Sequence, residues 1–138
     1  MMRVKLDDGA VVPTKGTQNS AGYDVCSIES ILIPPGTHSK IHTGVYLEIP
    51  HGSCGILSHR SGMNSKQGAQ VYGVIDSDYR GEVMITMFNS DPNHEIRVSP
   101  GDRVAQLRIV EVQTHTFEVV DELTVTKRGE GGHGSTGR

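Results

Sequence analysis

The sequence contains no tryptophan, only two phenylalanines and two cysteines, and no long apolar run. Two cysteines, Cys26 and Cys54, are too few for a disulfide framework, and no run approaches the roughly 18 apolar residues of a membrane helix. The opening MMRVKLDDGA lacks the apolar core of a signal peptide. These absences predict a soluble, intracellular protein with no membrane partner, and they leave cytoplasm or nucleus open.

Positive charge is not in excess either, because the formal net charge is −3. No basic surface for nucleic acid is therefore predicted. An anionic ligand would have to be held locally by arginines, and four stand near turn-forming residues: Arg60, Arg80, Arg103 and Arg128.

Short β-branched stretches separated by turn residues recur along the chain, which predicts an all-β sandwich or jelly roll. They are YDVCSI (23–28), SILIP (30–34), KIHTGVYLEIP (40–50), CGILSH (54–59), AQVYGVID (69–76), GEVMITMFN (81–89), HEIRVS (94–99) and DRVAQLRIVEVQTHTFEVV (102–120). Only MNSKQG at 63–68 suits a short helix. The 138 residues fit one domain, predicted over 1–127, with a flexible glycine-rich tail over 128–138.

The segment VMITMF at 83–88 is apolar on both strand faces, with Val83, Ile85 and Met87 on one and Met84 and Phe88 on the other. Such a strand is covered on both faces. The second cover is either a loop or a subunit interface. A hydrophobic content of 35% also leaves room for a core completed by partner subunits.

Two segments combine small residues with charged and hydroxyl side chains. In SHRSGM at 58–63, backbone N–H groups together with Arg60 and Ser61 could hold a phosphate oxygen, although a plain turn also fits. In GVIDSDYRGE at 73–82, Asp76 ends an apolar strand and could order a water or act as a general base. The alternative is a hairpin turn in which Asp76 or Asp78 caps backbone N–H groups.

Other polar residues are less specific. In GDRVAQL at 101–107, Gln106 could be a surface amide on a strand that turns Ala105 and Leu107 inward, with Ile109 following. The tail GEGGHGSTG at 129–137 lacks the lysine of a Walker A loop. None of the seven histidines has the spacing of a structural zinc site. His38 and His42 are expected on one exposed strand face.

Five segments together resemble, in order, the five motifs of the trimeric dUTPases: AGYDV (21–25), HRSGM (59–63), GVIDSDYRGE (73–82), GDRVAQL (101–107) and RGEGGHGSTG (128–137). The resemblance implies a jelly-roll, β-clip-like subunit in a threefold homotrimer whose active sites draw on all three chains. It also implies Mg²⁺-dependent hydrolysis of dUTP to dUMP and pyrophosphate, which limits uracil in DNA and supplies dUMP for thymidylate synthesis.

The resemblance assigns roles to individual residues. Asp24 would hold Mg²⁺ through water, and Asp76 would activate the attacking water with Ser61 and Arg60 at the reacting phosphate. Tyr79 would pack on the deoxyribose. The remaining substrate contacts would come from the loop at Gly62, the uracil-reading segment Gln70, Val71, Tyr72, Gly73 and Val74, the amide of Gln106, and the tail residues Arg128, Gly132, His133, Gly134, Ser135 and Thr136. His133 replaces the family's usual phenylalanine over uracil, and Tyr72 stands where small residues or proline are common.

Two other functions compete with this interpretation. A dCTP deaminase shares the trimeric jelly roll but needs an acid at the base edge, and Gln70, Val71, Tyr72 and Gly73 include no carboxylate. A catalytically silent nucleotide sensor is the second alternative, although Asp24, Asp76 and Arg128 are all present.

Overall fold

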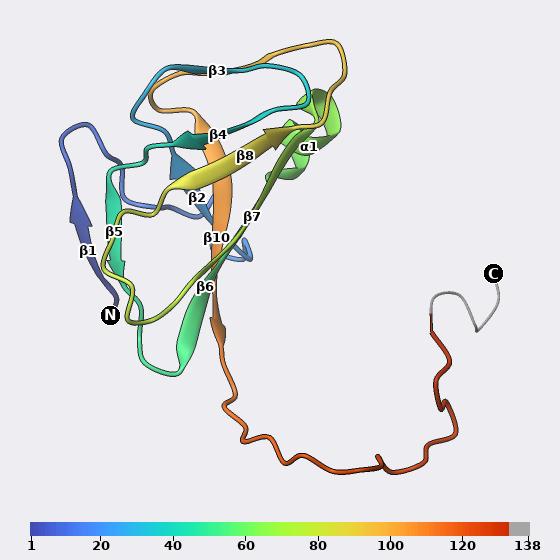
Figure 1. The fold of residues 1–138 in the computed structure, drawn as a ribbon. Coiled ribbons are helices and arrows are strands. Elements are labelled where there is room, and N and C mark those ends of the chain that lie inside the picture. The colour runs from blue at the N-terminus through green and yellow to red at the C-terminus, as the bar shows by residue number, and fades with distance from the viewer. Residues whose placement is uncertain (133–138) are drawn as a thin grey trace.

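A computed structural model describes residues 1–132 as a body of antiparallel strands followed by an extended arm (Figure 1). The strands are β1 Arg3–Leu6, β2 Tyr23–Cys26, β3 Ile31–Ile33, β4 His38–Ile41, β5 Val45–Glu48, β6 Ser53–Ser58, β7 Ala69–Ile75, β8 Ile85–Asn89, β9 Ile96–Val98 and β10 Arg103–Glu111. One helix, α1, spans Ser61–Gln67. The predicted all-β fold is confirmed, and the predicted short helix is present but begins two positions earlier, at Ser61 instead of Met63.

The main sheet has six strands in the order β2-β10-β6-β7-β8-β4, and two smaller pairs, β1-β5 and β3-β9, complete the curled body. Alternate residues of the strands point into one hydrophobic core. In β10 a register shift between Arg103 and Ala105 brings both Val104 and Ala105 inside. Leu107 is buried as predicted, whereas Ile109 is only partly buried.

Three sequence predictions about strands need correction. The stretch at 40–50 is two strands, because buried Thr43 donates its hydroxyl to the Val83 carbonyl and the chain turns at Gly44, whose φ is +63°. The strand predicted to reach residue 120 ends at Glu111, since no described strand pairs with the residues that follow it. Strand β1 was not predicted; all four of its residues are exposed, and it gains its structure from pairing with β5.

The outer face of β7 and β8 is uncovered. Val83, Ile85 and Met87 are buried, but Phe88 is 39% exposed and Tyr72 on the neighbouring strand 77%. No loop among residues 1–132 covers Phe88 or Tyr72, which favours a subunit interface as the second cover.

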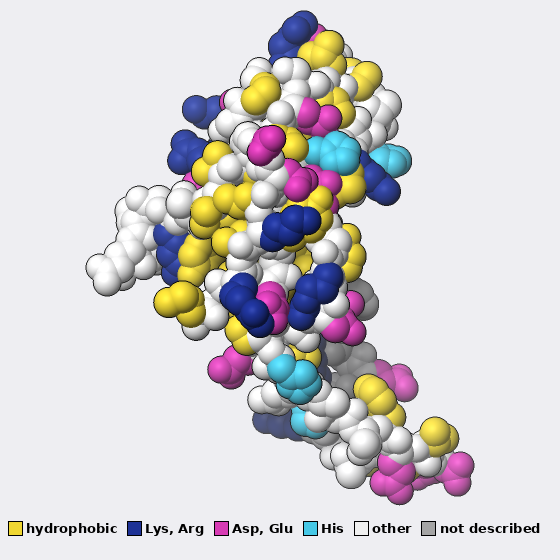
Figure 2. Space-filling model, turned by 90° about the vertical axis from the view of Figure 1, so that its left-hand side faces the viewer, with side chains coloured by type: hydrophobic (Ala, Val, Ile, Leu, Met, Phe, Trp, Pro, Cys, Tyr) yellow, Lys and Arg dark blue, Asp and Glu magenta, His cyan; other side chains and the backbone are white. Residues whose placement is uncertain are grey.

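Residues 112–130 leave the body as an arm (Figure 1) and are exposed along their whole length. The arm carries apolar side chains, and Phe117, Val119 and Val125 are almost fully exposed. On the face drawn in Figure 2, acidic and basic side chains are interspersed, with no broad area of one sign. In the described part of the chain no helix is long and apolar enough to cross a membrane.

Candidate active site

Three of the singled-out segments meet in one row across the main sheet. Gln106 of β10 lies opposite Asp24 of β2 on one side and opposite Ser58 of β6 on the other. Directly opposed residues of antiparallel strands project to the same face. The sheet register therefore brings Asp24, Gln106 and the segment that follows Ser58 together.

Asp24 is bound by two arginines. Its Oδ1 accepts from Nε of Arg60 at 3.0 Å, and its Oδ2 accepts from Nη1 of Arg103 at 3.4 Å. Arg60 also donates to the carbonyl of Arg103 at 3.4 Å. Since Asp24 is only 8% exposed, its charge is held by these partners. Two guanidinium groups around one carboxylate leave an excess of positive charge, which suits an anionic ligand.

Arg103 had no role in the predicted site, although it was among the four candidate arginines. Its contact with Asp24 depends on the pairing of β10 with β2, which sequence spacing does not reveal. The pKa of the neighbouring Cys26 thiol is raised above its ordinary value. Burial is the main cause, and the negative charge of Asp24 is the second.

The space beside the arginines is open. Arg60 has an extended backbone, and α1 begins immediately after it, at Ser61. Ser61 and Gly62 are exposed, and a Cβ added to Gly62 would meet no atom within 4 Å. A ligand next to Arg60 can therefore reach the Ser61 hydroxyl and the first backbone N–H groups of the helix.

A second polar group lies where β7 ends. The main chain makes the turn here, because the Tyr79 N–H donates to the Asp76 carbonyl at 3.1 Å. The Asp76 side chain is exposed and accepts no hydrogen bond from any described residue. Arg80 stabilises the turn by donating to the carbonyls of Ser77 and Tyr79 at 2.7 and 2.9 Å. The Asp76 carboxylate is thus free to bind a water, and it is not the capping group of the turn.

An open cavity of about 330 Å³ lies beside Asp76 and Tyr79. It exists because β7 pairs with β8 only from Ala69 to Val71, while its pairing with β6 continues to Ile75. From Tyr72 onward, one edge of β7 therefore has no partner strand within the described part of the chain. Unpaired strand edges present N–H and C=O groups that can recognise a ligand. Gln70, Tyr72 and Val74 are exposed on this strand, Gly73 is partly buried, and Val71 is buried.

The two polar groups lie at opposite ends of β6. Asp76 follows Ile75, which faces Gly55, whereas Arg60 lies beyond Ser58. From position 54 to position 60 an extended chain covers on the order of 20 Å at about 3.3 Å per residue. A single chain therefore does not bring Asp76 next to Arg60.

The described tail residues, 128–132, contribute to neither group in this chain. Arg128 donates from Nε to the Gly131 carbonyl at 2.7 Å, within a local turn of the arm. Gly132 is the last described residue, and His133, Gly134, Ser135 and Thr136 lie outside the described residues.

The side chains available as metal ligands indicate what kind of metal site the protein can form. Among residues 1–132 no group of three or more His, Cys, Asp or Glu side chains could hold a metal alone. Asp24 provides a single carboxylate. Mg²⁺ is commonly bound by one or two carboxylates together with waters and substrate phosphates. Asp24 fits such a shared site and does not fit a cage made by the protein alone.

The fold and these two groups define a small all-β protein suited to a phosphorylated ligand. The dUTPase family profile matches residues 8–137. Over 138 residues the chain is 40% identical to the deoxyuridine 5'-triphosphate nucleotidohydrolase of Corynebacterium efficiens, covering 98% of this chain and 76% of that relative.

Solved structures agree. The dUTPase of Staphylococcus bacteriophage 80alpha with dUPNHPP superimposes with a TM-score of 0.92 at 32% identity, covering 100% of this chain and 99% of the other. A mutant dUTPase of phage phi11 of S. aureus, described with a coordinated structural Mg(II) ion, gives 0.83 at 27% identity, covering 91% and 99%. The chain belongs to the dUTPase family, which confirms the resemblance and the predicted class of enzyme, a dUTP diphosphatase.

Proposed function

We propose that the protein hydrolyses dUTP to dUMP and pyrophosphate by attack of a water, held by Asp76, on the α-phosphorus. One observation carries this proposal: the free Asp76 carboxylate lies at the end of a strand whose backbone edge is open toward an adjoining cavity. A carboxylate without a protein partner can accept a proton from water as it attacks. The open edge supplies a place for the base next to it.

The backbone of β7 from Tyr72 to Val74 reads uracil. The uracil edge carries one N–H donor between two carbonyl acceptors, which an unpaired strand edge can complement. A 4-amino group, as in cytosine, presents a donor where the edge expects an acceptor. Mismatched polar groups that lose their hydration are rejected strongly.

Tyr79 excludes a ribose. Its ring borders the cavity beside Asp76. A ring packed against C2′ of the sugar leaves no space for a 2′-hydroxyl, so dUTP is preferred over UTP.

The phosphates bind at the Asp24 group, which consists of Asp24, Arg60, Arg103 and Gln106. Arg60, Ser61, Gly62 and Gln106 contact phosphate oxygens, and Arg103 adds a second guanidinium. Asp24 would hold Mg²⁺ through water, and the bound ion would offset negative charge on the triphosphate. The arginines stabilise the charge that develops on the departing pyrophosphate.

A homotrimer completes each site. Three observations support it: the Asp76 and Asp24 groups are separated in one chain, the β7–β8 face is uncovered, and the arm exposes Phe117 and other apolar side chains. Exposed apolar area of this kind marks a surface that another chain covers. One chain supplies the Asp76 turn and a second the Asp24 group. The tail 128–138 of a third covers the substrate, with Arg128, Gly132, Gly134, Ser135 and Thr136 on the phosphates and His133 over uracil.

Incubation with each deoxynucleoside triphosphate and Mg²⁺ tests the activity. Pyrophosphate should be released from dUTP alone. Ammonia released from dCTP would instead identify a deaminase, and binding of dUTP without turnover would identify a sensor.

A further inference from the structure

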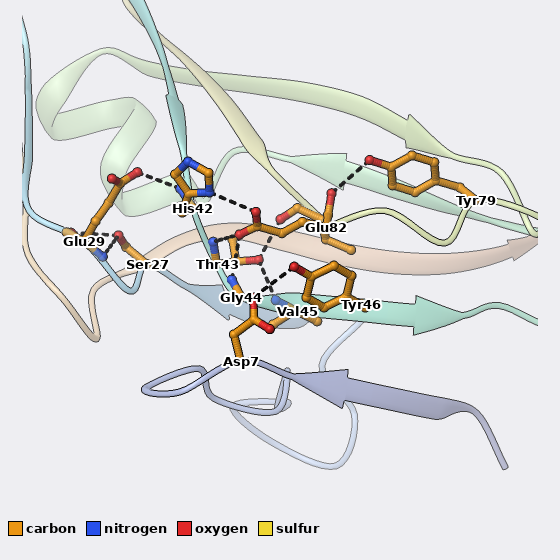
Figure 3. Close-up of polar contacts among 11 residues, drawn as sticks. Asp7, Ser27, Glu29, His42, Thr43, Gly44, Val45, Tyr46, Tyr79 and Glu82 are labelled. Atoms are coloured by element: carbon orange, nitrogen blue, oxygen red, sulfur yellow. Dashed lines mark hydrogen bonds and ion pairs between the residues drawn. The ribbon is translucent and has the colours of Figure 1, made fainter.

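Glu82 anchors the end of the Asp76 turn to the loop between β4 and β5 (Figure 3). Its Oε1 accepts from the backbone N–H groups of Thr43 and Gly44, at 2.9 and 2.8 Å. Its Oε2 lies 2.8 Å from Nδ1 of His42. Three partners from consecutive residues thus hold one carboxylate, whose side chain is only 16% exposed.

Two further bonds fix the next residue to the same loop. The Thr43 hydroxyl donates to the Val83 carbonyl at 2.7 Å, and the Val83 N–H donates to the Val45 carbonyl at 2.8 Å. Thr43 is fully buried. Hydrogen bonds therefore fix the backbone at 82–83 to residues 43–45, so its position depends on the β4–β5 loop.

The ring of Tyr79 rests on this anchored backbone. Its hydroxyl donates to the Glu82 carbonyl at 3.1 Å (Figure 3). The ring also lies so close to Gly81 that a Cβ there would overlap the Tyr79 hydroxyl and ring carbons. Tyr79 is itself 47% exposed, so little else restrains it. The backbone of Gly81 and Glu82 thus sets where the ring lies.

We propose that the Glu82 carboxylate is a positioning residue for sugar discrimination: by anchoring the backbone at 81–82 to residues 42–44, it fixes the Tyr79 ring and so the space at C2′. The inference rests on the proposed function, because the contact of Tyr79 with the deoxyribose belongs to it. A purely structural Glu82 would stabilise the fold without changing the choice of sugar. The two roles are separated by the ratio of kcat/KM for UTP to kcat/KM for dUTP.

The test compares this ratio in the full-length protein and its variants, with melting temperature as a parallel readout. Glu82→Ala removes all three bonds and should raise the ratio about tenfold, since hydrogen bonds to a charged group are among the stronger ones. Glu82→Gln should stay within about threefold of the unmodified protein. Its amide oxygen can accept both N–H bonds, and its NH2 can donate to a neutral imidazole.

A matched control is available at Asp91. Its Oδ1 also accepts two backbone N–H groups, of Asn93 and His94 at 2.8 and 2.9 Å, and lies 3.2 Å from Nδ1 of His94. Asp91→Ala should lower the melting temperature without changing the ratio. An unchanged ratio in folded Glu82→Ala, or an equal change in Asp91→Ala, would overturn the inference.

If Glu82→Ala does not fold, Gly81→Ala decides. The half-exposed Tyr79 ring can give way to the added methyl, so this variant should fold and its ratio should rise; an unchanged ratio would overturn the inference. Tyr79→Ala distinguishes a failure of the proposed function from a failure of the role proposed for Glu82. If it leaves the ratio unchanged, or if the unmodified protein does not hydrolyse dUTP, the proposed function fails first. If Tyr79→Ala raises the ratio and Glu82→Ala does not, only the role of Glu82 fails.

Discussion

The two carboxylates of the site differ in almost every physical respect. Asp24 is buried, and each of its oxygens accepts a hydrogen bond from an arginine. Asp76 is exposed, and no described residue donates to it. The group proposed for phosphate binding is thus assembled before substrate arrives, whereas the group proposed to activate water is left free for water.

Because of this difference, substitutions at the two carboxylates should affect folding and activity to different degrees. A buried carboxylate that loses a cationic partner is left with an unmet charge, which costs free energy of unfolding. An exposed carboxylate without a partner can be neutralised at little cost. Changes at the Asp24 group should therefore affect both folding and activity, and changes at the Asp76 carboxylate should affect activity alone.

The largest expected effect is that of Asp76→Asn. The amide cannot take a proton, so turnover of dUTP should fall about a thousandfold, within the range attributed to general base catalysis. The melting temperature should be nearly unchanged. Asp78→Asn, two residues away and also exposed, is the control and should retain activity. A loss of only about tenfold, roughly 1.4 kcal/mol of barrier, would show that another group activates the water.

Deletion of residues 128–138 comes next. Turnover should drop about a hundredfold, because Arg128 and the glycine-rich segment are proposed to cover the triphosphate. Light scattering and calorimetry should show an unchanged oligomer and melting temperature. A truncated protein that is monomeric or melts much earlier would make the tail structural.

Arg60→Ala tests whether the two carboxylates contribute differently to stability. It leaves Asp24 with Arg103 alone, whose contact is longer and whose side chain is more exposed. The free energy of unfolding should fall by about 1–3 kcal/mol, as for a lost hydrogen bond to a charged group. Denaturant titration measures it. The comparison is Arg80→Ala, because among the described residues Arg80 donates to backbone carbonyls and to no carboxylate. Equal free energies of unfolding for Arg60→Ala and Asp76→Asn would show that the two carboxylates do not differ in their contribution to stability.

The smallest effect concerns His42 and pH. A hydrogen bond to Glu82, the charge of Glu82 and that of Glu29 raise the pKa of His42 and outweigh desolvation. Desolvation acts on Glu82 in the raising direction, but hydrogen bonds from Gly44, His42 and Thr43 and the charge of His42 lower its pKa.

The sign of the pH effect follows from these directions. The contribution of His42 to stability is complete below its pKa in the unfolded state, about 6.5, and is lost as pH rises through its raised pKa in the folded state. The Glu82 contribution is lost only in acid. The melting temperature of His42→Gln should therefore fall below that of the unmodified protein by on the order of 1 °C at about pH 6, and by less at about pH 9. His38→Gln, on the exposed edge of β4, is the control. A gap that does not depend on pH would contradict the ion pair.

Much of the molecule was predictable from local patterns. Short β-branched stretches between turn residues marked β2, β6, β7 and β8, and MNSKQG at 63–68 marked α1. Arg60, Asp24 and Gln106 were predicted as one site by resemblance, and the register of β10 explains why they meet.

Other features could not be predicted, because they depend on contacts between distant parts of the chain. The open edge of β7 arises where β8 diverges from it, and the Glu82 anchor needs the β4–β5 loop 38 to 40 positions away. Alternating apolar residues also extended β10 too far: VQTHTFEVV has the pattern of a strand but no partner strand among the described residues.

In the proposed trimer, each active site combines the Asp76 turn of one chain with the Asp24 group of another. Subunit complementation tests it directly. Asp76→Asn and Arg60→Ala chains, each inactive alone, are co-expressed in equal amounts with different affinity tags, and the mixed oligomers are purified. If the two groups come from different chains, each purified mixed trimer has one site in three that combines two intact groups, so about a third of dUTP turnover should return. If both groups belong to one chain, no site is intact, and mixed oligomers as inactive as the parents would contradict the account.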